Sequence, residues 1–92
     1  MHANDILAIA RRAESLAPGA LSAPAQGSLN RALSLLDHAS VQLTLPQVDW
    51  QDFATDLEGA RRELVNARRG MAPEQSEAAR LIAVELFDII AG

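Results

Sequence analysis

Apolar residues recur along most of the chain at steps of three and four positions, the spacing of one face of an α-helix. Pro and Gly divide this pattern into four stretches, which predict helices at about residues 4–17, 24–43, 50–69 and 73–91. The links are short, so we expect one all-α domain, residues 1–92, folded as an up-down-up-down four-helix bundle. The alternative is a three-helix core with a loosely attached first helix, because the first connection is the longest.

The composition points to the same fold class. Of the 92 residues, 18 are Ala and 13 are Leu, both strong helix formers. Ile and Val together number nine, and aromatic residues make up only 3% of the chain. Residues that favour strands are therefore scarce, which argues against sandwich and barrel folds.

Several residues are suited to begin or end these helices. Asn4 and Asp49 can accept the free amide protons of a first turn, so we expect them to be N-caps. Pro18-Gly19 should end the first helix, and Pro73 should start the fourth. Gly70 follows the third helix, where a terminating residue of left-handed conformation is expected. Helices three and four should therefore form a tight antiparallel hairpin.

The charged residues and the missing residue types exclude many functions. The chain has no Cys, and because all eight of its positive residues are Arg it has no Lys. Thiol chemistry, Schiff bases and a phosphate-binding loop lysine are thus ruled out. We predict no enzymatic activity, no cofactor and no small-molecule substrate. The net charge of −4 argues against a dedicated nucleic-acid or anionic-membrane binder. Charges also interrupt every apolar stretch long before the roughly 20 residues of a membrane span, so we expect a cytoplasmic protein.

No metal site is predicted. His38 lies beside Asp37, but neighbouring residues on a helix point about 100° apart, so the pair is expected to be at the surface without sharing a ligand. Asp52 and Asp56 share a helix face, which is more typical of a solvated surface than of a cation site. On that third helix, Phe53 and Leu57 should be core residues.

The fourth helix is more apolar than a bundle position requires. Between Leu81 and Ile90, eight of ten residues are apolar, and they cover well over half of the helix circumference. A central helix covered by its own chain is one explanation. The one we favour is an interface, because so small a domain rarely encloses a helix fully. We therefore predict a contact surface at Ala83, Val84 and Phe87, most simply between the two copies of a homodimer.

The third helix carries two further candidates for partner contact. Trp50, at its start, is expected to pack on the core, with a surface contact as the alternative. Four arginines towards one edge, Arg61, Arg62, Arg68 and Arg69, would suit phosphate groups, although Glu58 shares that edge. The expected function is a non-enzymatic protein–protein interaction module of the adaptor, chaperone, inhibitor or antitoxin-like kind. The alternative is a nucleic-acid-associated regulator that uses these arginines.

Overall fold

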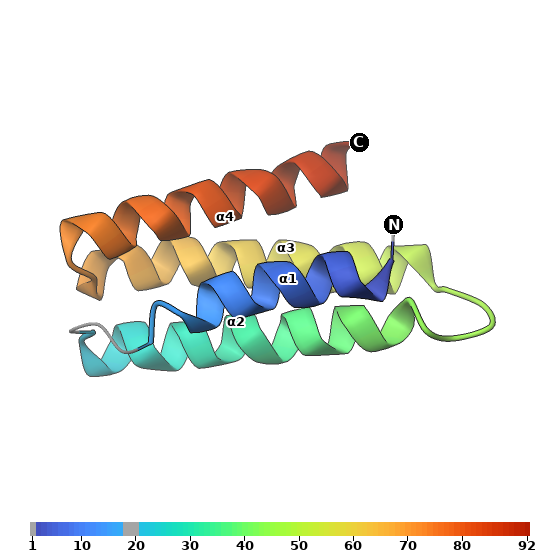
Figure 1. Cartoon of the computed structure of the whole chain (residues 1–92), viewed down its shortest axis with the longest axis horizontal. Helices are drawn as coiled ribbons and strands as arrows, with labels where there is room; N and C mark the ends of the chain where they lie inside the picture. Colours follow the sequence, from blue (N-terminus) through green and yellow to red (C-terminus); the bar gives the residue numbers. More distant parts are fainter. Residues whose placement is uncertain (1, 18–20) are drawn as a thin grey trace.

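The computed structural model describes residues 2–17 and 21–92, which form four α-helices and one short 3₁₀ turn. The α-helices are α1 (Ala3–Glu14), α2 (Ala23–Gln42), α3 (Trp50–Ala67) and α4 (Pro73–Ala91), and the 3₁₀ turn is η1 (Arg68–Gly70). Successive helices run in opposite directions (Figure 1). The predicted all-α four-helix bundle is confirmed. The predicted end of the first helix at Pro18-Gly19 lies outside the described residues.

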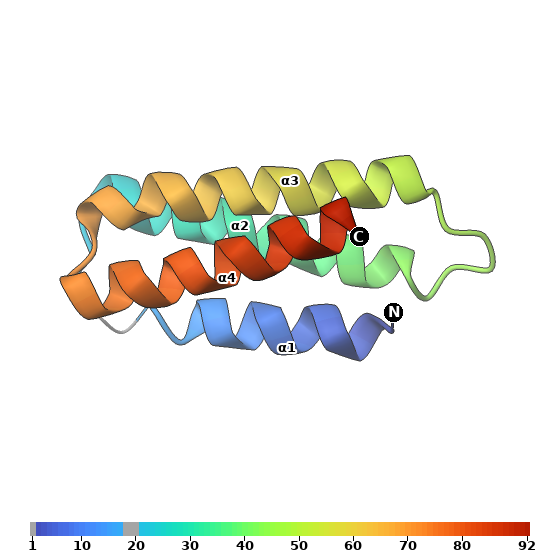
Figure 2. The ribbon, with the colours of Figure 1, turned by 90° about the horizontal axis from the view of Figure 1, so that it is seen from above.

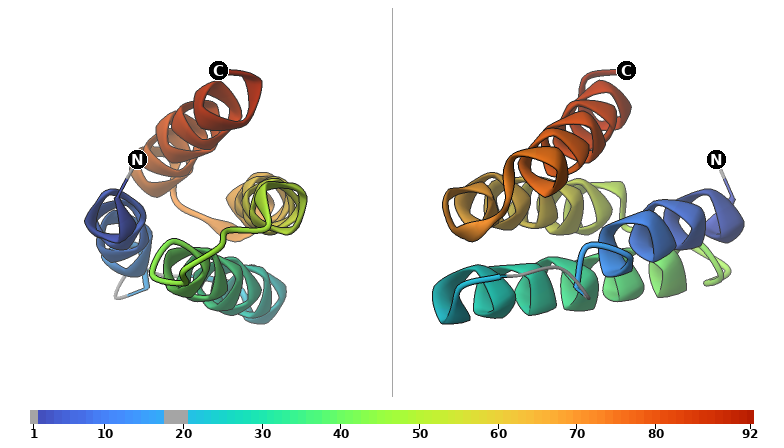
Figure 3. Two further views of the ribbon diagram at one scale, coloured as in Figure 1. Left: turned by 90° about the vertical axis from the view of Figure 1, so that its right-hand side faces the viewer. Right: turned by 60° about the vertical axis from the view of Figure 1, so that its left-hand side comes forward.

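The helices occupy the four corners of the bundle in chain order, as a view along it shows (Figure 3). The most extensive contact is between α2 and α3, and the lightest is between α1 and α4. Figure 2 shows why: α4 crosses the bundle obliquely, and its C-terminal half diverges from α1. Among the described residues, no helix is both long and apolar enough to cross a bilayer.

All four helices supply the core. Helix α1 contributes Ile6, Ile9 and Ala13, all nearly or fully buried, so the alternative of a three-helix core does not hold. Phe53 and Leu57 are buried as predicted. Alanines recur among the buried positions and let the helices approach closely; they are Ala13, Ala32, Ala39, Ala60 and Ala79.

The helix ends follow local hydrogen bonds and differ in part from the prediction. Asn4 is not the cap of α1: the helix begins one residue earlier, and the Asp5 carboxylate accepts a bond from the His2 amide at 2.9 Å. Helix α1 also ends at Glu14 instead of residue 17, because the chain continues as a turn. Asp49 does cap α3, accepting from the Asp52 amide at 3.0 Å.

Gly70 serves a different purpose from the predicted one. Its φ is not positive, and α3 continues into the 3₁₀ turn η1 instead of ending in a left-handed residue. The Gly70 carbonyl accepts a bond from the Ser22 amide at 3.0 Å, at the start of α2. A Cβ at position 70 would lie only 1.9 Å from the Ser22 Oγ and 2.7 Å from the Ala25 Cβ. Glycine is required here because two chain segments meet closely.

Candidate functional site

The apolar residues of α4 have three different surroundings. Ile82 and Leu86 are buried in the core, while Ile89 and Ile90 are only partly buried at the diverging end of the helix. The remaining large side chains point away from the bundle and are about half exposed; they are Leu81 (50%), Val84 (46%) and Phe87 (55%). Since α4 packs on α3 and touches α1 only lightly, the described part of the chain leaves this side of the helix exposed.

We call this surface the α4 outer face and define it by Arg80, Leu81, Val84, Phe87 and Asp88. All five residues are exposed. At 3.6 residues per turn they fall within an arc of about 120° centred on Val84. Figure 2 views the bundle from this side, and none of the other drawn helices lies over α4.

A groove of about 270 Å³ runs beside this face, between α3 and α4. Its lining comprises Arg61, Val65, Arg80, Ala83, Val84 and Phe87. Ala83 is buried and lines this groove together with Arg61 and Val65 of α3, so a partner would reach it within the groove. Val65 is 42% exposed and extends the apolar surface onto α3. Of the three predicted interface residues, Val84 and Phe87 are therefore accessible, and the interface itself stays a prediction.

Trp50 does not pack on the core as expected, since it is 60% exposed. Its ring meets the Phe53 ring edge-on, with centroids 5.7 Å apart. The first turn of α3 extends beyond the C-terminal end of α4 (Figure 1). Trp50 instead forms one wall of a second groove, of about 240 Å³, whose other walls include Ile89 and Ile90.

The four arginines of α3 and η1 do not form one basic patch. Glu58 accepts hydrogen bonds from Arg61 at 2.5 and 2.8 Å and from Arg62 at 3.0 Å. The Arg61 hydrogen bond is the main reason why the pKa of Glu58 falls to about 2, and Arg62 adds to it. Arg68 and Arg69 both lie in the 3₁₀ turn η1, where Arg68 donates a hydrogen bond to the Ser76 hydroxyl at 3.0 Å. Two of the four guanidinium groups thus share one carboxylate, which offsets one of the four positive charges.

His38 has a partner that the sequence reasoning missed. Its Nδ1 is hydrogen-bonded to the carboxylate of Asp56, which belongs to α3 and is buried. One turn away, the Gln42 amide donates to Asp52 at 2.7 Å. Hydrogen bonding to Asp56, and then the negative charge of that residue, raises the pKa of His38. Each helix supplies residues four apart, but only the register of α2 against α3 brings them together.

This cluster connects α2 and α3. The ligand atoms of His38, Asp52 and Asp56 all lie within 4.8 Å of one another, so these residues could hold a divalent cation. However, the imidazole and the Asp56 carboxylate already satisfy each other, and Gln42 satisfies Asp52. We therefore interpret the cluster as a set of hydrogen bonds that holds α2 against α3.

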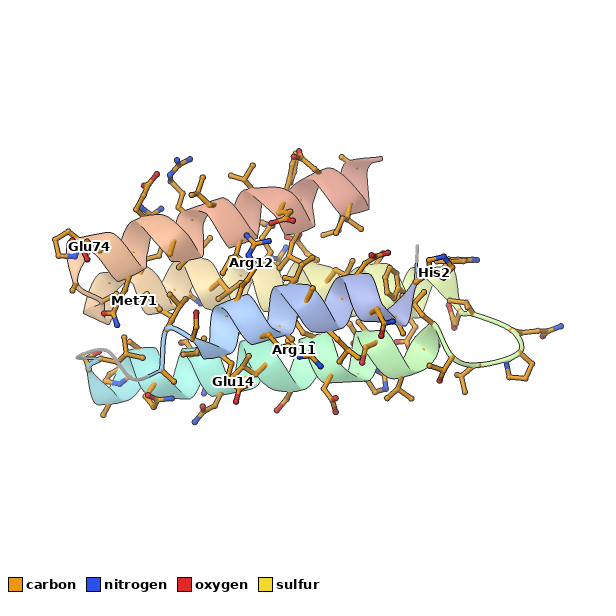
Figure 4. All side chains as sticks on the ribbon, in the orientation of Figure 1. His2, Arg11, Arg12, Glu14, Met71 and Glu74 are labelled. Carbon is orange, nitrogen blue, oxygen red and sulfur yellow. The ribbon has the colours of Figure 1, made fainter. Side chains whose placement is uncertain are left out.

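One ion pair joins the two helices that pack least. Arg12 extends from α1 towards α4 (Figure 4) and reaches Glu85 at 2.6 Å. Both side chains are about half exposed, so the pair contributes only about 0–1 kcal/mol. It lies on the α1 side of α4 and leaves the α4 outer face open.

Comparison with known proteins adds no functional information. No family model matches the chain, and no curated protein and no solved structure is similar enough to count as a match.

Proposed function

We propose that this chain is a non-enzymatic protein-interaction module whose contact surface is the α4 outer face together with the groove between α3 and α4. The supporting observation is that Leu81, Val84 and Phe87 are about half exposed side by side on one helix. A partner that presents the apolar face of a helix suits this surface. Such a surface suits an adaptor, chaperone, inhibitor or antitoxin-like role, and the cytoplasmic location stays the expectation from the sequence.

The exposed area is large enough to matter for binding. Burying one such side chain completely contributes about 1.5–3 kcal/mol, and roughly half of that remains available where half of the side chain is exposed. The three side chains together therefore offer about 3 kcal/mol per copy of the protein. Large apolar side chains at the centre of a patch, with charged residues at its edge, are typical of protein interfaces.

The test replaces Phe87 by Arg and measures association by sedimentation velocity and folding by circular dichroism. We expect the parent to self-associate and the F87R variant to sediment as a folded monomer, because an unpaired charge is not tolerated in an apolar contact. The control is Leu45→Arg, at a residue of similar exposure (46%) in the link between α2 and α3. Unfolding of F87R would show that Phe87 is a core residue, and a parent that is monomeric at high micromolar concentration would leave only a foreign partner.

The nucleic-acid alternative receives no support from the geometry, because Glu58 pairs with Arg61 and Arg62. A salt titration separates the two functions. A phosphate-binding surface needs affinity for generic DNA that falls steeply with salt, and we expect no such binding.

A further inference from the structure

We infer that the occupant of the α4 outer face is α4 of a second copy of this chain, lying antiparallel to the first and centred on Val84. This inference rests on the proposed function, since it requires the outer face to be a contact surface. It goes further by naming the partner and the register of the contact.

The outer face has the pattern that a symmetric pair needs. Leu81 and Phe87 lie three residues to either side of Val84, and Arg80 and Asp88 lie four residues to either side. In a twofold interface the same patch is used by both copies, so each residue must suit the one that it meets. In an antiparallel pair centred on Val84, Leu81 lies level with Phe87 of the second copy.

The charges select this direction. In the antiparallel pair Arg80 lies level with Asp88 of the second copy, on the other side of the line of contact, so opposite charges attract across both ends of the apolar centre. A parallel pair would bring Arg80 level with Arg80, and Asp88 level with Asp88. Among the described residues Asp88 takes part in no salt bridge. Arg80 bonds to Glu77 at 2.9 Å, but this pair is exposed and little is lost by exchanging it.

The groove between α3 and α4 fits the same arrangement. On the helix wheel, Phe87 lies on the α3 side of Val84, at about −60°. In an antiparallel pair the twofold axis is perpendicular to the plane that contains the two helix axes. Rotation about this axis leaves a side chain on the same side of that plane. Phe87 of the second copy therefore arrives on the α3 side, level with position 81, beside the groove formed by Val65, Arg80 and Ala83. Both copies make this contact.

Disulfide cross-linking tests the register, because the chain contains no Cys. Three single variants are prepared: Arg80→Cys, Val84→Cys and Asp88→Cys. Each position is exposed, so the variants should fold, and circular dichroism checks this. At 1.5 Å per residue, two copies of position 80 lie about 12 Å apart along an antiparallel pair, whereas positions 80 and 88 lie level. Rates of disulfide formation under mild oxidation are compared for each variant alone and for an equal mixture of R80C and D88C.

We expect V84C to cross-link with itself, and the R80C and D88C mixture to cross-link at least tenfold faster than R80C or D88C alone. Faster cross-linking of R80C alone than of the mixture would establish a parallel pair and overturn the inference. Equal rates for all combinations would overturn it too, because no register is then fixed. In both cases rapid cross-linking of V84C would still support the proposed function. Slow cross-linking of V84C together with a monomeric parent would refute self-association itself.

Discussion

Replacing Gly70 by Ala tests why glycine is needed where η1 meets the start of α2. The backbone of Gly70 lies in a region that any residue can adopt, so conformation alone does not require glycine. The added Cβ, however, would lie 1.9 Å from the Ser22 Oγ, 2.9 Å from the Ser22 Cβ and 2.7 Å from the Ala25 Cβ. All three distances are below normal contact, so α2 or η1 must shift to make room.

The expected cost of G70A follows from this overlap. Overfilling a packed contact typically costs about 1–3 kcal/mol, and we expect about 2 kcal/mol here. For a domain of this size that corresponds to a fall in Tm of roughly 8–16 °C, measured by circular dichroism. Gly27→Ala is the matched control, because the nearest atom to its Cβ is the Arg31 Nη1 at an ordinary 3.5 Å. Gly27 lies inside α2, so that change should stabilise the protein by about 0.5–1 kcal/mol.

A double variant identifies the cause of the loss. Ser22→Gly removes both Ser22 atoms that would overlap and costs only a few tenths of a kcal/mol as a cap substitution. If close approach is the reason for Gly70, G70A should be less harmful in the S22G background by at least about 0.5 kcal/mol. An equal loss of stability in both backgrounds, or no loss at all, would refute this reasoning.

Three further predictions concern the core and two ion pairs. Leu57→Ala should reduce the free energy of unfolding in urea by about 2–5 kcal/mol, and a loss below 1 kcal/mol would contradict its burial. The raised pKa of His38 means that its pairing with Asp56 stabilises the fold below pH about 6.5, and that this stabilisation is lost as pH rises through the raised pKa. The difference in urea midpoint between the parent and His38→Gln should therefore disappear above that pKa. The lowered pKa of Glu58, about 2, means that its pairing with Arg61 stabilises the fold fully above pH about 4.5 and that this stabilisation is lost towards pH 2. Equal urea midpoints for the parent and Glu58→Gln already at pH about 4 would contradict this prediction.

The order, number and approximate limits of the helices follow from local signals in the sequence. Apolar spacing, the Asp49 cap and Pro73 act within one turn of the chain, so they can be identified without knowing the fold. The errors occur where a local signal competes with another contact. Asn4 is a good cap, but the Asp5 carboxylate accepts a hydrogen bond from the His2 amide, and the helix begins at Ala3.

Contacts between helices could not be predicted from the sequence, for a different reason. The neighbour of His38 in the chain is Asp37, but its hydrogen-bond partner is Asp56, eighteen positions away. Finding that pair requires the register of α2 against α3. Trp50 has the spacing of a core residue, but it stays exposed because a groove separates it from Ile89 and Ile90 of the diverging helix α4. A helical pattern identifies which residues share a face, and the length and angle of the neighbouring helices decide whether that face is buried.

The same reasoning explains why α4 presents the candidate surface. The apolar arc of α4 is wider than the surface that packs on the neighbouring helices. The oblique path of α4 reduces its packing on α1 further towards its C-terminal end (Figure 2). A helix that only completed the core would need apolar residues towards the other helices and polar residues on its outer side. On α4 the exposed side carries Val84 at its centre and opposite charges at Arg80 and Asp88, symmetrically placed. The core does not require that pattern, whereas the antiparallel pair that we infer makes use of it.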